Sequence, residues 1–184
     1  GPVVFSPEGS KMAYACCGVD SDQLVVLDLA TGDKTVWAVG NYFWDIAWFR
    51  GGASLAYSTL IPLEVREVAA PMAAPQLLYS ASAGHLDIDS ARTNPNQLII
   101  SHNDAAGHGR IGLWEDGVGL VNPDLANSTK SWQGTLNCTD TKLAYMGVQN
   151  NSGSQAFYIR ELTSGATTLV SKNANILLQF WPTC

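Results

Sequence analysis

The chain has 184 residues, of which 46% are hydrophobic and 14% are charged, and its formal net charge is −6 at pH 7. This length suffices for one well-buried core or two small ones. The basic residues form no stripe that could neutralise phosphates, so nucleic acid is not an expected partner. No apolar run approaches the roughly 18 residues of a membrane helix, so we expect no membrane span.

The first 40 residues predict four short strands separated by turn sequences. VVF (3–5) is followed by the turn SPEGS and by the strand KMAY (11–14). QLVVLDL (23–29) and TVWAVG (35–40) come next, joined by ATGDK. Clusters of Gly, Pro, Asn and Asp between apolar runs are typical of hairpin turns. We therefore expect one four-stranded antiparallel sheet in this segment.

The same arrangement returns along the chain. The second strand of each unit begins at Met12, Leu55, Leu98 or Leu143, so successive copies lie 43, 43 and 45 residues apart. A second register repeats independently, because VLDLATG (26–32) matches IRELTSG (159–165) at an offset of 133 residues. No segment shows sustained helical periodicity, and Gly and Pro interrupt every long stretch.

Four short strands in every 43–45 residues predict an all-β fold, a β-propeller of four four-stranded blades. A sheet with two apolar faces buries both of them only between two neighbours. The expected blades span approximately 3–44, 45–87, 88–132 and 133–175, with 176–184 as the start of a fifth repeat. Because that start duplicates VVF (3–5), three arrangements stay open: a small ring, part of a larger propeller, or a ring completed by a second chain.

The turn and strand sequences resemble a known repeat family. FSPEGSKMAY (5–14) followed by LVVLDLATGDKT (24–35) resembles the PD40 (TolB-like) repeat, a relative of WD40. The fourth unit keeps KLAY (142–145) and ELTSG (161–165), but has Asn-Cys-Thr-Asp (137–140) where the family has Ser-Pro-Asp-Gly. The resemblance implies a propeller, usually of six to eight blades. Its motifs specify turns and core packing, and they carry no catalytic residues.

Propeller ligands bind at the mouth of the central channel, on loops of one face. One loop expected there carries the aromatic run Tyr42, Phe43 and Trp44 between Asn41 and Asp45. Rings beside amide and carboxylate groups suit stacking on a sugar or gripping a peptide. The alternative is that Phe43 and Trp44 fill a gap between blades. The candidate ligand-binding residues are Asn41, Tyr42, Trp44, Asp45, His85 and Trp132.

Two further groups of side chains are candidate binding sites for metal cations. His102, Asp104 and His108 fall in one loop and have the imidazole and carboxylate groups of metal ligands. A solvated Gly-rich hairpin is the alternative there. Several carboxylates near the expected channel have the oxygen chemistry that holds Ca²⁺, or serve as turn and cap residues: Asp20, Asp22, Asp45, Asp87 and Asp89. Apart from calcium, we expect no cofactor.

The search for catalytic patterns finds no GxSxG, HExxH, P-loop or Rossmann motif, so we expect no enzyme. The leading hypothesis is a non-catalytic binding or scaffolding propeller that recognises protein or glycan through its loop face. One alternative is an accessory propeller from a larger secreted enzyme or surface protein. A metal-dependent enzyme built on the histidine loop is a more remote alternative.

The cysteines and sequons bear on the compartment. The four cysteines, Cys16, Cys17, Cys138 and Cys184, lack the spacing of a zinc site. At least two are expected to be small buried apolar residues, and one disulfide involving Cys138 or Cys184 stays open. Low Lys content and three sequons, at Asn127, Asn137 and Asn150, are compatible with an extracytoplasmic protein. Gly1-Pro2 fits a protease scar or a point where a longer chain was cut.

Overall fold

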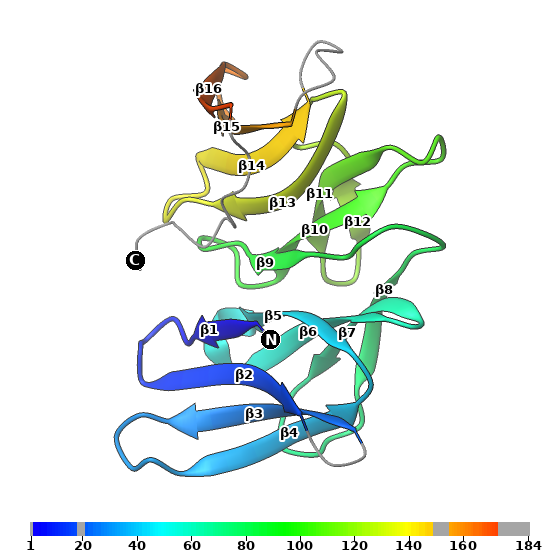
Figure 1. The fold of residues 1–184 in the computed structure, drawn as a ribbon. Helices are drawn as coiled ribbons and strands as arrows, with labels where there is room; N and C mark the ends of the chain where they lie inside the picture. The colour runs from blue at the N-terminus through cyan, green and yellow to red at the C-terminus, as the bar shows by residue number, and fades with distance from the viewer. Residues whose placement is uncertain (1, 18–20, 149–154, 173–184) are drawn as a thin grey trace.

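The structure is a computed structural model that describes residues 2–17, 21–148 and 155–172. These residues form four antiparallel sheets of four strands each, here called blades 1 to 4 in chain order (Figure 1). Blade 1 contains β1 (Val3–Phe5), β2 (Lys11–Cys17), β3 (Asp22–Asp28) and β4 (Lys34–Gly40). Blade 2 contains β5 (Phe43–Phe49), β6 (Ser54–Leu60), β7 (Leu63–Val68) and β8 (Gln76–Ser80).

The other two blades repeat this order. Blade 3 contains β9 (Ile88–Ser90), β10 (Gln97–Asn103), β11 (Gly109–Glu115) and β12 (Gly119–Asn122). Blade 4 contains β13 (Lys130–Leu136), β14 (Lys142–Val148), β15 (Ala156–Glu161) and β16 (Thr167–Ser171). The predicted all-β fold of four four-stranded blades is confirmed. In the part of the chain that the structure describes, the one helical segment is the short 3₁₀ turn η1 (Arg50–Gly52), and no helix is long and apolar enough to cross a membrane.

Two blades begin earlier than the sequence indicates. β5 begins at Phe43 and β13 at Lys130, before the expected boundaries at 45 and 133. Phe43 pairs with Thr59 in the sheet, and its buried ring packs edge-on against Tyr57 at 5.0 Å. The predicted fifth repeat, 176–184, lies outside the described residues.

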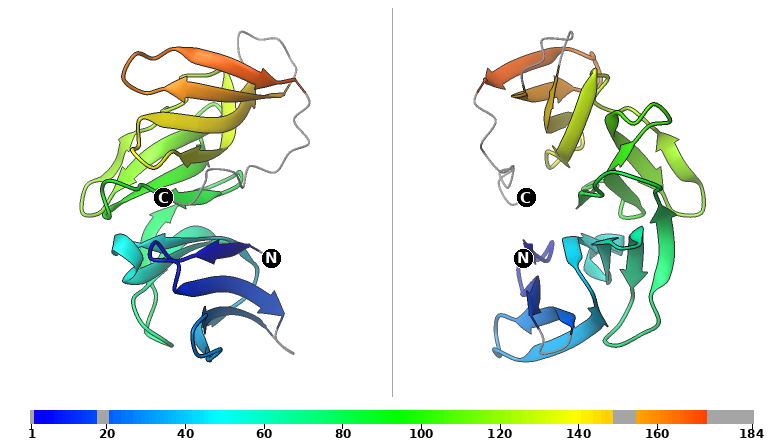
Figure 2. Two further views of the ribbon diagram at one scale, coloured as in Figure 1. Left: turned by 90° about the vertical axis from the view of Figure 1, so that its left-hand side faces the viewer. Right: turned by 45° about the vertical axis from the view of Figure 1, so that its right-hand side comes forward.

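The four sheets are arranged along an arc, with blade 1 at one end and blade 4 at the other (Figure 2). The first strand of each blade lies innermost, and β1 packs beside β5, β5 beside β9, and β9 beside β13. Each pair of neighbouring blades encloses its own apolar core. Leu55, Leu98 and Leu143, the repeat anchors of blades 2 to 4, are each 0% exposed in these cores. Burial between like neighbours therefore explains why the strand is repeated.

The first turns of blades 1 and 4 have the same geometry despite their different sequences. In blade 1, Ser6 Oγ accepts the Lys11 N–H at 3.0 Å, and Gly9 has φ +70°. In blade 4, Asn137 Oδ1 accepts the Lys142 N–H at 2.8 Å, and Asp140 has φ +52°. Asp is one of the few residues besides Gly that tolerates this left-handed conformation. Asn-Cys-Thr-Asp thus replaces Ser-Pro-Glu-Gly without changing the turn.

The cysteines have different states. Cys138 is disulfide-bonded, so the disulfide left open by the sequence is present at this residue. Cys16 is a free thiol on β2 and is partly buried.

Each inner strand has one edge to which none of the described strands is paired, and side chains of the neighbouring blade bond to this edge. Ser90 Oγ donates to the Trp48 carbonyl on this edge. Trp48 Nε1 also links two blades, donating at 3.3 Å to the Val4 carbonyl, which lies on the β2 side of β1. Asp45 Oδ2 accepts the Ile88 N–H at 2.9 Å. Each bond joins residues about one repeat apart. Backbone N–H and C=O groups that would bond to another strand in a closed sheet bond here to side chains of a neighbouring blade.

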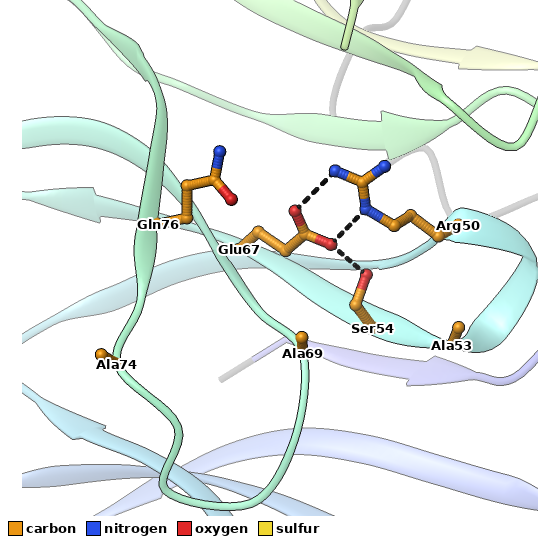
Figure 3. Close-up of a pocket in the computed structure, with 7 residues that line it drawn as sticks. All are labelled: Arg50, Ala53, Ser54, Glu67, Ala69, Ala74 and Gln76. Carbon is orange, nitrogen blue, oxygen red and sulfur yellow. Dashed lines mark hydrogen bonds and ion pairs between the residues drawn. The ribbon is translucent and has the colours of Figure 1, made fainter. Parts of the chain in front are cut away.

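An ion-pair cluster at the opposite ends of the strands joins blades 2 and 3. Arg50 donates from Nε and Nη2 to Glu67 at 2.6 and 3.0 Å (Figure 3). It also donates from Nη1 to Asp116 at 2.8 Å. Ser54 Oγ donates to Glu67 at 2.6 Å, and the two carboxylates raise the pKa of Arg50. Glu67 belongs to β7, whereas Asp116 follows β11. Arg50, Ser54 and Glu67 border a cavity of about 350 Å³, whose other walls are Ala53, Ala69, Ala74 and Gln76.

The Arg50 cluster predicts a large effect of one substitution on stability. Replacing Arg50 with Met leaves the buried Glu67 carboxylate without its cation, and we expect the free energy of unfolding to fall by about 3 kcal/mol. Urea denaturation followed by circular dichroism measures it. The control is Lys142→Met, which removes an exposed pair with Glu161 and should cost less than about 1 kcal/mol. Equal losses in both variants would contradict the prediction.

Candidate ligand site at the channel mouth

The loops that enter β5 and β9 meet at one end of the inner strands. Tyr42 precedes β5 with φ +58°, and its N–H donates to Asp22 Oδ2 at 3.0 Å. Its side chain is exposed, as is Asn41 before it. Asp22 begins β3, so a carboxylate of blade 1 holds the loop that carries the aromatic run.

Trp44 is the extra residue of a β-bulge. The β5–β6 ladder shifts register between Phe43 and Asp45, so Trp44 has no direct partner in β6. A bulge of this kind redirects a side chain. Phe43 stays buried whereas Trp44 is 41% exposed. The expectation that both rings fill a gap between blades therefore applies to Phe43, and Trp44 faces solvent.

The Trp44 ring is nevertheless held in place. Its Nε1 donates to Asp87 Oδ1 at 3.0 Å, and its ring stacks on His85 with centroids 5.3 Å apart and an interplanar angle of 24°. Gly84 lets the loop approach blade 3, because it has φ +105° and a Cβ there would lie 2.7 Å from the Asn103 side chain. The structure thus brings together the predicted residues Trp44 and His85 from loops of two blades.

Behind this aromatic pair lies Asp45. Its two carboxylate oxygens accept the N–H groups of Ile46 and Ile88, both at 2.9 Å. Burial raises the pKa of Asp45 to about 7, and the charges of Asp87 and Asp89 add to the shift. Through its bond to Ile88, this carboxyl group of blade 2 holds blade 3 in place, so Asp45 has a structural role.

The two other carboxylates of this region lie on the next blade. Burial raises the pKa of Asp87, while the hydrogen bond from Trp44 and the backbone N–H of Gln133 oppose the rise. Burial also raises the pKa of Asp89, opposed first by the charge of Arg92, which contacts it at 3.0 Å. We call Trp44, Asp45, His85, Asp87 and Gln133 the channel-mouth cluster.

Gln133, whose backbone N–H donates to Ser101 Oγ at 3.0 Å, was not predicted to lie in this region. The predicted residue was its neighbour Trp132, which is partly buried. Its ring packs against Gly109, where an added Cβ would lie 3.6 Å from it. A second bulge, between Trp132 and Gly134, makes Gln133 the unpaired residue of β13, in the same way as Trp44 in β5. Residue type gave no signal of this, because a bulge depends on how the two strands align.

The described residues give no support to either cation hypothesis. Among residues 2–17, 21–148 and 155–172, no three His, Cys, Asp or Glu side chains are grouped as metal ligands. The carboxylates of Asp45, Asp87 and Asp89 are instead occupied by backbone N–H, indole, hydroxyl and guanidinium donors. These contacts favour the alternative role of Asp45, Asp87 and Asp89 as turn and cap residues that join blades, and calcium stays an untested prediction. Asp20 lies outside the described residues.

The histidine loop also differs from a metal site. His102 is 5% exposed, with Nε2 2.9 Å from the Pro123 carbonyl and Nδ1 3.2 Å from the Asn103 carbonyl. Asp104 accepts Arg110 Nε and the His108 N–H, both at 2.9 Å, and its Oδ2 lies 3.6 Å from His108 Nδ1. The hairpin alternative fits these contacts better, and the metal site at His102, Asp104 and His108 stays an untested prediction.

A second hollow lies toward the opposite ends of the inner strands. Its volume is about 370 Å³, and it touches all four blades. Trp48 and Phe5 supply its large apolar surfaces, while Asp89 and Arg92 supply its charges. The sequence analysis assigned nothing to this end of the channel.

Comparison with known proteins supports the fold. No known family model and no curated protein matches the chain. The structure resembles TolB from Acinetobacter baumannii (TM-score 0.82, 16% identity, 94% of this chain, 43% of that one). It also resembles a putative TolB from Agrobacterium tumefaciens, with a TM-score of 0.71 and 12% identity over 90% of this chain and 62% of that one. A gluconolactonase from Xanthomonas campestris matches with a TM-score of 0.62 and 11% identity over 79% of this chain and 53% of that one. The fold is therefore a TolB-like β-propeller, and the chain spans less than two thirds of the length of each.

The pKa of Asp45 predicts how stability depends on pH. The folded protein keeps a proton on Asp45 up to about pH 7, whereas the unfolded chain releases it near 3.8. The free energy of unfolding should therefore fall as pH rises through this interval, by at most about 1.4 kcal/mol per pH unit from this group.

Asp45→Asn should make this slope shallower. Urea denaturation of both proteins between about pH 4 and pH 7 measures the free energy of unfolding of each. Subtracting the two curves removes the contribution of the other carboxylates, which titrate in both proteins. Parallel curves for the two proteins would contradict the prediction, whatever their absolute stabilities.

Proposed function

We propose that the chain is a non-catalytic, ligand-binding β-propeller that recognises a protein or a glycan at the channel mouth. The observation that carries this proposal is the state of Trp44, which is exposed but held by Asp87 and stacked on His85. A large ring already fixed in one orientation loses little conformational freedom when a ligand stacks on it. Structural roles alone do not require an exposed, oriented indole.

The surroundings of Trp44 fit both classes of ligand. Tyr42 adds a second exposed ring, and Asn41 adds amide donors and acceptors in the same loop. Rings beside polar groups stack on the apolar face of a sugar or pack on a peptide side chain. In either case, the ligand lies over the entering loops of blades 2 and 3.

Binding without catalysis is the proposal that these contacts favour. The polar groups of the cluster are engaged in holding the blades together, as the Asp45 carboxylate shows with its bonds to Ile46 and Ile88. The similarity to a gluconolactonase leaves an enzyme as the competing function, and that similarity concerns the fold alone.

We also place the protein outside the cytoplasm. The disulfide at Cys138 supports this, since disulfides persist mainly in oxidising compartments. A second candidate is an accessory propeller within a longer protein, which is supported by the 43% of the Acinetobacter TolB chain that this chain matches. The same loop face would then bind the protein or glycan ligand as one part of the longer protein.

The proposal predicts that Trp44 carries binding energy. The immobilised chain is screened against a glycan array and against extracytoplasmic proteins, and the strongest binder is titrated by calorimetry. Trp44→Ala should weaken binding at least tenfold, or about 1.4 kcal/mol. The control Leu77→Ala removes a side chain of similar exposure on β8 and should bind as the parent does. Unchanged binding by Trp44→Ala would contradict the proposal.

A further inference from the structure

Each blade after the first receives the preceding blade on an equivalent set of positions. In blade 2, this receiving face lies in the core shared with blade 1, and its side chains are at most 4% exposed. It consists of Ile46, Trp48, Leu55, Tyr57 and Val68. Blade 3 uses Leu98 and Ile100 in the same way, and blade 4 uses Leu143 and Tyr145.

Blade 1 carries the same face, but none of the four described blades covers it. Strand pairing identifies the equivalent residues, because Trp48 pairs with Leu55 as Phe5 pairs with Met12. By the same pairings, the set is Val3, Phe5, Met12, Tyr14 and Leu27. Val3 is 44% exposed and Phe5 is 55% exposed, whereas their counterparts Ile46 and Trp48 are buried. An apolar face that matches a buried one position by position is built to be covered.

The opposite surface of blade 4 carries the complementary set. Blade 1 packs on blade 2 through Leu24, Val26 and Trp37. The pairings of blade 4 make Phe157, Ile159 and Val170 the equivalent residues, and Val170 and Trp37 are both the unpaired residue of a bulge. Val170 is 51% exposed, whereas Trp37 is 9% exposed.

We propose that the open face of blade 1 binds the open face of blade 4 of a second copy, head to tail. The contact continues the series of interfaces that already joins blades 1 to 2, 2 to 3 and 3 to 4. Two such contacts close a ring of eight blades, which lies within the usual range for propellers. The two surfaces differ, so the contact is heterologous and each copy contributes one of each. The channel-mouth cluster lies on other residues, so this proposal is independent of the proposed function.

The inference is tested by sedimentation equilibrium of the 184-residue chain and three variants. Phe5→Glu and Val170→Glu each place a charge on one open face, and because both positions are exposed, each variant should fold. Val118→Glu is the control, since Val118 is 69% exposed in the turn between β11 and β12. The parent and the control should sediment as dimers, and each face variant as a species of half that mass. Circular dichroism spectra verify that all four proteins are folded.

A mixture of the two face variants separates head-to-tail binding from other arrangements. Phe5→Glu keeps an intact blade 4 face, and Val170→Glu keeps an intact blade 1 face. An equal mixture should therefore form a dimer through one contact, although neither variant does so alone. A monomeric parent, polymers that grow with concentration, or a mixture that stays monomeric would each overturn the two-copy ring.

Discussion

The structure depends on how the inner strands complete their hydrogen bonding. Among the described strands, β1, β5, β9 and β13 each pair with one strand only, so their channel-facing backbone groups need other partners. Side chains from the adjacent blade supply them, as Ser90 does for the Trp48 carbonyl and Asp45 does for the Ile88 N–H. These bonds join positions about one repeat apart, and the apolar cores between blades follow the same spacing. Repetition of the sequence is thus a requirement of the packing.

The same bonds explain why the candidate site lies where it does. Asp45 must reach blade 3 to bond Ile88, and the bulge before it turns Trp44 out of the sheet toward the loop of His85. Asp87 then fixes the indole. Blade assembly and ligand presentation therefore use neighbouring atoms, and the raised pKa of Asp45 reflects the burial that assembly imposes.

The repeat anchors predicted the fold because burial of Leu55 and its counterparts is encoded directly in residue type and spacing. The site was predicted in part, since Trp44 and His85 were chosen for their chemistry and do meet. Gln133 was missed because strand alignment, rather than residue type, makes it the bulge residue. The metal site was predicted from nearness in sequence, which does not specify where side chains point. The sequence therefore did not show that the His102 ring contacts the Pro123 carbonyl.

Hydrogen exchange at the Ile88 amide tests the central claim most directly. This N–H lies on the free edge of β9 and bonds only to the Asp45 carboxylate among the contacts of the described residues. The account predicts that it exchanges as slowly as amides in the middle of blade 3, and that Asp45→Ala makes it exchange much faster. Exchange of Ile88 in the unaltered protein at the rate of an open strand edge would contradict the account.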